Sequence, residues 1–375
     1  MMRLVTCYNG QAVFDAAYCH EQHQDAKITP HENHTPQDKT DNGTERLVGF
    51  EIEYAGLTLE TAAEIIHDLY GGTITRETDA IYQVLDTTLG EFTLELDAIP
   101  LQKLAEAAAE TETTSGEDQS LTDDLQVQLY KAVGDAGAKI APYEIVAPPI
   151  PLRKIPDLEK LCVQLRDQDA QDTTSRLHFA FGLHINPEVL STDTASILRH
   201  LQSFLLLYPW LKQQHNVDFA RRVTRFITPF PKPYYERILQ SHYQPGFTQL
   251  VTDYYTDNPT RNRALDMLPL FAHIDAALIR RLYGAEEKIN PRPTFHYRLP
   301  NCELANPDWS LDMEWRRWLH VEQVANSDAL FTELMTRWHS HNESWLTSEE
   351  DWAREVAQIM VTAQDNGDWP DNADD

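Results

Sequence analysis

The sequence predicts an α+β protein in which helices pack on one face of a mainly antiparallel β-sheet. Short segments that alternate apolar and polar residues predict strands, and longer segments with apolar residues at three- and four-residue steps predict helices. The two kinds of segment interleave without a strict strand–helix–strand rhythm, which favours α+β over a parallel sheet. The 375 residues, 42% of them hydrophobic, are enough for one large domain or two modest ones with a sizeable core.

Alternation places the expected strands in five regions. They cover residues 47–55, a hairpin over 82–97 that turns near 88–90, and residues 143–147, 178–186 and 294–299. Helical spacing predicts helices at residues 58–70, 121–137, 158–167, 191–212, 260–283 and 312–339. In the first helix, Thr61 and Glu64 fit a capping box, and Gly71-Gly72 ends the helix.

Composition divides the chain into three parts. Residues 1–43 are polar and carry few periodic apolar residues, so we expect a flexible leader. Residues 363–375 are an acidic tail. Between them, residues 44–362 are expected to form one domain, with helical insertions at 191–290 and a helical C-terminal part at 311–362.

Charge and hydropathy exclude several classes of partner. The formal net charge of −28 opposes binding to nucleic acid or to an anionic membrane surface. The chain has no run of about 18 apolar residues and no N-terminal basic segment followed by an apolar stretch, so we expect a cytoplasmic protein. The 4 cysteines form no CxxC pair, which is typical of reduced thiols.

The chemistry lies on one face of the expected strands. Successive side chains of a strand point to opposite faces, and here one face is apolar while the other carries acids, imidazoles or a guanidinium group. The polar-face candidates are Glu51, Glu53, Glu95, Glu144, His184, Asn186, His296 and Arg298. Lysine is absent from all five polar faces. Because clustered carboxylates repel one another unless cations compensate, the pattern favours a Mg²⁺ site over five separate solvated faces.

The motifs differ in specificity. Gly49-Phe50-Glu51-Ile52-Glu53 and Gly182-Leu183-His184-Ile185-Asn186 are the most specific, since each sets two polar side chains on one face of an apolar strand. The segment from Glu144 to Pro149 is moderately specific, and Glu95 lies in a weaker pattern. No GxxxxGK[ST] loop and no GxGxxG after a strand occurs, which argues against P-loop and Rossmann enzymes.

Two arginine groups could bind anions. Arg221, Arg222 and Arg225 could hold ATP phosphates through forked contacts, or could pair with surface acids. Arg261-Asn262-Arg263 is expected to begin the helix over residues 260–283, where it could hold an anion or belong to a plain capped surface helix. Arg298 is the better anion candidate, because its strand already points at the proposed site.

The order of these motifs between about residues 46 and 300 resembles the amidoligase family, which is related to glutamine synthetase and glutamate–cysteine ligase. The resemblance implies a glutamine-synthetase-like curved, mainly antiparallel sheet with helices on its convex face, and a concave face that binds ATP and Mg²⁺ or Mn²⁺. It implies an ATP-dependent carboxylate–amine ligase that joins a small-molecule or peptide carboxylate to an amine through an acyl phosphate. It also implies a glutamine amidotransferase-like pathway partner.

The resemblance also implies a role for each matched residue. The metal ligands it implies are Glu51, Glu53, Glu95 and His184, and the imidazole of His296 can also bind a metal. Arg298 would steady the transferred phosphoryl group and Glu144 would position substrate or bind metal, while Asn186 joins the arginines at 221, 222 and 225 as a candidate for ATP binding. The late strand departs from the family pattern, because relatives usually carry Glu-x-Arg where this chain has His296-Tyr297-Arg298.

Two other functions stay open on the sequence. Acid clusters also serve two-metal hydrolysis, so a metal-dependent phosphoesterase is one alternative, although the charge of −28 argues against a nucleic-acid substrate. The other is a degenerate, non-catalytic nucleotide- or metal-binding member of the same fold, which the histidine at position 296 favours.

Overall fold

The computed structural model describes residues 37–96, 143–168, 181–215, 227–284, 289–343 and 348–366. Its strands form one open sheet in which every pair of neighbours is antiparallel. The main path through the sheet runs β2-β3-β4-β5-β1-β7-β9-β8, and β6 pairs with β1 beside it. The mixed architecture and the antiparallel sheet confirm the coarse fold class predicted from the sequence.

The centre of the sheet is β1 (Leu47–Tyr54), which carries the first of the two specific motifs. It pairs with β5 (Tyr143–Val146) on one side and with β7 (Leu183–Pro187) on the other. The short strand β6 (Ile150–Pro151) pairs with the start of β1. Strands from three distant parts of the chain therefore lie side by side where the polar motifs occur.

Each edge of the sheet adds further strands. On one side, β2 (Thr73–Thr78), β3 (Ile81–Leu85) and β4 (Phe92–Leu96) form consecutive hairpins that reach β5. On the other side, β9 (His296–Tyr297) pairs with β7, and β8 (Leu265–Asp266) pairs with β9. The predicted hairpin over residues 82–97 thus corresponds to β3 and β4.

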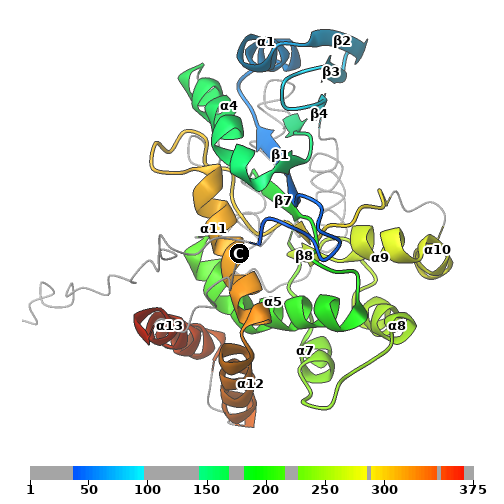
Figure 1. Ribbon diagram of the computed structural model, residues 1–375, viewed down its shortest axis with the longest axis vertical. Coiled ribbons are helices and arrows are strands. Elements are labelled where there is room, and N and C mark those ends of the chain that lie inside the picture. The colour runs from blue at the N-terminus through cyan, green and yellow to red at the C-terminus, as the bar shows by residue number, and fades with distance from the viewer. Residues whose placement is uncertain are drawn as a thin grey trace, which may run out of the picture.

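The helices surround the sheet, with α1 and β2 to β4 at one end of the long axis and α12 and α13 at the other (Figure 1). Their bounds are α1 Leu59–Tyr70, α4 Ile155–Asp167, α5 Thr194–Gln214, α7 Lys232–Ile238, α8 Phe247–Asp257, α9 Leu268–Ile274, α10 Ala276–Tyr283, α11 Leu311–Asn326, α12 Asp328–Glu343 and α13 Glu349–Asn366, and a 3₁₀ turn at Leu152–Lys154 precedes α4. Within the described ranges, none of these helices has an apolar stretch long enough to cross a membrane.

Aromatic side chains join the helices to the apolar face of the sheet. Tyr70 of α1 stacks on Phe92 of β4 with ring centres 5.7 Å apart. Tyr297 of β9 contacts Phe204 of α5 at 5.9 Å and Trp318 of α11 at 5.2 Å. Because side chains alternate along a strand, burying Tyr297 among helices turns its neighbour His296 to the opposite face.

A buried ion pair fixes the start of β1 to the helical layer. Arg46 lies beside Glu322 of α11, with Nη1 2.9 Å from Oε2 and Nη2 on Oε1, and both side chains are almost fully buried. Trp318 donates from Nε1 to Oε1 of Glu322 at 2.5 Å, and Arg46 donates from Nε to the carbonyl of Glu188 at 2.7 Å. These partners satisfy the buried charges, as a charge removed from water requires.

The structure corrects three predictions about helices. The predicted helix over 260–283 is wrong, because the segment contains β8 followed by the two short helices α9 and α10. The predicted helix over 312–339 is two helices, since α11 ends at Asn326 and α12 begins at Asp328. The capping box at Thr61 is also wrong, because Thr58 is the N-cap of α1 and accepts a hydrogen bond from the Thr61 amide.

Several predicted segments are described only in part. Residues 37–43, the end of the expected leader, are described, and the amide of Asp41 donates to the carbonyl of Leu190 at 2.9 Å. The rest of the leader, the helix expected over 121–137 and residues 367–375 of the acidic tail lie outside the described residues. The domain boundaries therefore stay predictions.

Candidate active site

One row of carboxylates crosses three neighbouring strands. Glu53 of β1 lies directly opposite Glu144 of β5, and Glu144 lies directly opposite Glu95 of β4. Directly opposed residues in an antiparallel pair have Cβ atoms about 4.5–5.5 Å apart, so three acids share one strip of the sheet. Glu53 also accepts a hydrogen bond at Oε2 from the amide of Gly182, at 2.6 Å.

A second row runs alongside and contains imidazoles. Glu51 of β1 lies opposite His184 of β7, while Asp266 of β8 lies opposite His296 of β9. Because Ile185 of β7 pairs with Tyr297 of β9 in antiparallel register, His296 lies opposite Asn186 and diagonal to His184, with the two imidazole ring centres 5.1 Å apart. The row therefore joins a carboxylate and two imidazoles, with a further carboxylate at its end.

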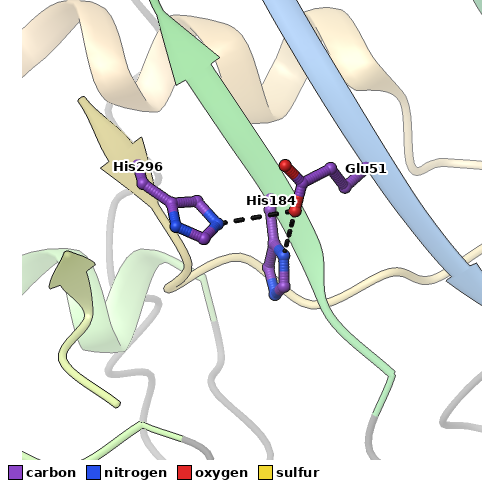
Figure 2. A group of neighbouring side chains, drawn as sticks. All are labelled: Glu51, His184 and His296. Carbon is purple, nitrogen blue, oxygen red and sulfur yellow. Dashed lines mark hydrogen bonds and ion pairs between the residues drawn. The ribbon is translucent and has the colours of Figure 1, made fainter. Parts of the chain in front are cut away.

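Glu51 is the most heavily contacted acid of the second row, and it is only 8% exposed. Its Oε2 atom lies 2.8 Å from Nδ1 of His184 and 3.5 Å from Nε2 of His296 (Figure 2). Its Oε1 atom accepts hydrogen bonds from Nδ2 of Asn186 at 3.0 Å and from Nη2 of Arg292 at 2.9 Å. Figure 2 shows that the Glu51, His184 and His296 side chains point toward one another from three strands.

These contacts determine the charge states of the central pair. Burial by itself would raise the pKa of Glu51, but the imidazoles of His296 and His184 outweigh it and hold that pKa well below its usual range. Burial lowers the pKa of His184 to about 3, against the opposing effect of the hydrogen bond that His184 donates to Glu51. Near neutral pH, Glu51 is therefore ionised and His184 is neutral.

The neutral state of His184 determines which ring atom can bind a metal. Its Nδ1–H donates to Glu51, because an ionised carboxylate can only accept. Its Nε2 atom then keeps a lone pair, and this atom lies 3.5 Å from Oε1 of Glu53. A lone pair that faces a carboxylate oxygen is an arrangement that a cation stabilises. Glu53, Glu144 and His184 accordingly offer three ligand atoms within 4.8 Å of one another.

His296 gives the same indication from the second row. It is 5% exposed, and neither ring nitrogen makes a hydrogen bond within the described part of the chain. Nε2 faces Glu51, and Nδ1 lies 3.4 Å from Oδ2 of Asp266. Glu51, His184 and His296 also offer ligand atoms within 4.8 Å of one another. Buried nitrogens without hydrogen-bond partners, beside carboxylates, fit a divalent cation.

Cationic side chains lie at the margin of this cluster. Arg298 follows the His296-Tyr297 strand and donates from Nη1 to the carbonyl of Arg261 at 3.0 Å. Arg261 lies 3.3 Å from Asp266 through Nε, while Arg263 turns away and donates to the carbonyls of Thr228 and Pro229. Arginines beside carboxylates and imidazoles are suited to phosphate groups.

The structure brings most of the predicted site residues together. Glu51, Glu53, Glu144, His184, Asn186 and His296 meet on one face, and Glu95 lies in the carboxylate row. Arg298 follows Tyr297, and the antiparallel pairing of Tyr297 with Ile185 sets Arg298 opposite His184. The arginines at 221, 222 and 225 lie outside the described residues, so their predicted role in ATP binding is not placed.

Sequence reasoning misses two residues of the cluster, Asp266 and Arg292. Asp266 is fully buried, and its signal is an isolated acid between Leu265 and Met267 in an apolar segment. The sequence predicts a helix for that segment, so it does not predict the strand in which Asp266 pairs with His296. Arg292 lies between two prolines, in a segment without helical or strand periodicity, so no pattern relates it to Glu51.

The fold and the cluster define a mixed α/β protein whose open antiparallel sheet gathers carboxylates, imidazoles and guanidinium groups on one face. Residues 44–320 match a family model whose description is "Putative amidoligase enzyme". This match covers more than half of the chain, so the chain belongs to that family. No curated protein and no solved structure matches the chain.

Proposed function

We propose that this protein is an ATP-dependent carboxylate–amine ligase that forms an amide bond through an acyl phosphate and uses Mg²⁺ or Mn²⁺. The observation that carries the proposal is the convergence of Glu51, Glu53, Glu144 and His184, from three strands, on one face of the sheet. Family membership supports the ligase class. We further propose that the sheet is curved as in glutamine synthetase, with the cluster on its concave face.

The carboxylate row of Glu53, Glu144 and Glu95 is the proposed position for Mg²⁺. Oxygen-only donor sets suit hard cations, which also bind phosphate oxygens. The one imidazole lone pair of His184, on Nε2 3.5 Å from Oε1 of Glu53, lies between this row and the second row and would serve a single metal. When bound, the metal would neutralise phosphate charge and align the nucleotide, which is most of what phosphoryl transfer requires of a protein.

The arginines and Asn186 are the proposed contacts of the nucleotide. Arg298 and Arg292 carry permanent positive charge next to the acids, where they would meet the charge that develops during phosphoryl transfer. Asn186 is held by Glu51 through Nδ2, and its buried Oδ1 atom has no hydrogen-bond partner among the residues that the structure describes. The arginines at 221, 222 and 225 stay candidates for the ATP phosphates.

The remaining assignments follow from the same proposal. The substrates would be a small-molecule or peptide carboxylate and an amine, and a glutamine amidotransferase-like protein would act in the same pathway. Glu144 would position substrate where it does not bind metal. We also propose that the protein works in the cytoplasm.

Two observations favour a second function, nucleotide or metal binding without turnover. Arg292 already places a positive charge 2.9 Å from Oε1 of Glu51, and position 296 holds histidine instead of glutamate. A built-in cation and a missing negative charge both weaken the binding of the metals that phosphoryl transfer needs, so the cluster would bind a nucleotide or one metal without turnover.

A screen for ADP release tests the ligase proposal. Purified protein is incubated with ATP, Mg²⁺ and pairs of carboxylates and amines, including amino acids and polyamines, beside the Glu51→Gln variant. The proposal expects ADP release that needs both organic substrates and that falls at least about a hundredfold in the variant, as loss of a group that stabilises the transition state does. Equal release from both proteins would remove the site assignment, whereas ATP binding without release would support the second function.

A further inference from the structure

The two rows of the site offer different donor chemistry. Glu53, Glu144 and Glu95 offer carboxylate oxygens. The second row offers one carboxylate, from Glu51, and imidazoles from His184 and His296. Oxygen donors suit Mg²⁺, whereas imidazole nitrogens suit Zn²⁺, Fe²⁺ and their neighbours, and two histidines with one carboxylate form a donor set typical of catalytic zinc and iron sites.

Asp266 lies behind His296 in a fixed position. Its side chain is fully buried, Oδ1 accepts from the amide of Leu268 at 3.0 Å, and Oδ2 lies 3.3 Å from Nε of Arg261. The same Oδ2 atom faces Nδ1 of His296 at 3.4 Å. A carboxylate on one nitrogen of an imidazole selects the tautomer that carries hydrogen there and leaves the other nitrogen as a stronger metal ligand.

We propose that Glu51, His184 and His296 bind a divalent transition metal of the Zn²⁺ or Fe²⁺ class in preference to Mg²⁺, and that Asp266 positions His296 for this binding. Asp266 keeps hydrogen on Nδ1 and leaves the lone pair of Nε2 on the side of Glu51. A glutamate at position 296 would place its negative charge directly on the metal. Here Asp266 supplies the negative charge instead, from the far side of the His296 ring. The inference deepens the proposed ligase function and rests on it for the presence of a metal in the cluster.

Independent observations point to an ion in this position. His296 is buried and its Nε2 atom makes no hydrogen bond within the described residues, and Oδ1 of Asn186 is likewise buried without a partner. Three neighbouring strands supply the donors, since Glu51 lies opposite His184 and His296 lies diagonal to His184 with ring centres 5.1 Å apart. Buried polar atoms are normally satisfied, so these atoms indicate a ligand that completes their contacts.

Calorimetry with Co²⁺ and Mg²⁺ on chelator-treated full-length protein tests the proposal. Co²⁺ serves as the probe because it is stable in air and reports its ligands by visible absorption. Most sites prefer Co²⁺ to Mg²⁺, so the deciding quantity is the change in the affinity ratio between variants. The proposal expects His296→Glu to lower the Co²⁺/Mg²⁺ ratio at least about tenfold and to shift the Co²⁺ absorption, since nitrogen is replaced by oxygen.

Asp266→Asn tests the positioning role separately. We expect Co²⁺ affinity to fall about 10- to 100-fold while Mg²⁺ affinity stays within about twofold, because only the imidazole ligand depends on Asp266. Asp253→Asn is the matched control, since Asp253 is another buried aspartate, held by Arg237 and Tyr243 away from the cluster. Should Asp266→Asn fail to fold, the His296→Glu comparison decides the metal preference alone.

Two results would overturn the proposal: an unchanged affinity ratio and absorption in His296→Glu, or equal Co²⁺ affinity in folded Asp266→Asn and wild type. Failure of the ligase proposal looks different. Protein that shows the expected metal preference but releases no ADP in any substrate pair loses the ligase assignment and keeps this one. Protein that releases ADP but lacks the expected metal preference keeps the ligase assignment and loses this proposal.

Discussion

Arg292 forms an ion pair with Glu51, with Nη2 of the arginine 2.9 Å from Oε1 of the carboxylate. The side chain of Arg292 is 26% exposed and that of Glu51 is 10% exposed, so the pair lies at the boundary between the buried cluster and solvent. A guanidinium group here stabilises the ionised carboxylate. It also competes with any divalent cation that binds the same acid, because two cations in contact with one carboxylate repel each other.

We therefore expect Arg292→Met to tighten metal binding at Glu51. Removing the competing charge should raise Co²⁺ affinity about two- to fivefold, which corresponds to the roughly 0.5–1 kcal/mol of a partly exposed ion pair. Calorimetry on the chelator-treated variant measures the change, and Arg292→Lys, which keeps the charge, is the control. Weaker binding in Arg292→Met would mean that the arginine holds Glu51 in the orientation that binds the metal.

Glu144 gives a second test, because it is the central member of the carboxylate row. A ligand that binds only the folded state stabilises it by about 2.7 kcal/mol at 100 times its dissociation constant. We expect saturating Mg²⁺ to raise the melting temperature of the wild type by several degrees and to raise that of Glu144→Gln much less. Differential scanning fluorimetry with and without Mg²⁺ measures both shifts. Glu60→Gln, on the exposed side of α1, should respond as the wild type does.

Strand periodicity explains why much of the site could be predicted from the sequence. Glu51, Glu53, His184 and Asn186 alternate with fully buried apolar residues, and a period of two determines the face of each side chain. The pairing of Glu51 with His184 then needs only the two specific motifs to lie on neighbouring strands, which they do.

The same reasoning fails where an element is too short to show a period. Strands β8 and β9 span two residues each, so Asp266 carries no alternation signal, and its apolar neighbours fit a helix equally well. Its position follows from pairing with His296, a long-range contact that one sequence does not encode locally. The break between α11 and α12 at Ser327 is hidden in the same way, because the apolar spacing continues across it.

The loop between α1 and β2 gives a test of backbone conformation. Gly72 has φ +94°, and a Cβ added there would lie 2.3 Å from the carbonyl oxygen of Leu85, whereas Gly71 has φ +73° and open space around it. Both alanine substitutions should cost roughly 1–3 kcal/mol of backbone strain. We expect Gly72→Ala to destabilise the protein by at least about 1 kcal/mol more than Gly71→Ala, because the carbonyl at the end of β3 must also move. Urea unfolding of the two variants measures the difference, and equal midpoints would contradict the expected contact.

The buried pair of Arg46 and Glu322 predicts a specific dependence of stability on pH. Burial would raise the pKa of Glu322, but Arg46 outweighs it and holds that pKa below the ordinary value of 4.5. A carboxyl whose pKa is lower in the folded state stabilises the fold above the unfolded pKa, and this contribution is lost as pH falls through the folded pKa. At pH 7, Glu322→Gln should therefore lower the free energy of unfolding by about 3–5 kcal/mol, since it leaves Arg46 buried without its counter-charge.

The difference in the free energy of unfolding between wild type and Glu322→Gln should then narrow below about pH 4.5. In that range Glu322 of the wild type takes up a proton on unfolding, so it stabilises the fold less relative to the neutral glutamine. Other acids with lowered pKa values, such as Glu314, make both proteins less stable in acid, so the comparison isolates Glu322. Urea unfolding of both proteins between pH 3 and pH 7 measures the two curves. A difference in the free energy of unfolding that stays constant across this range would mean that the variant loses packing around α11 and not the charge pair, because packing contacts do not depend on pH.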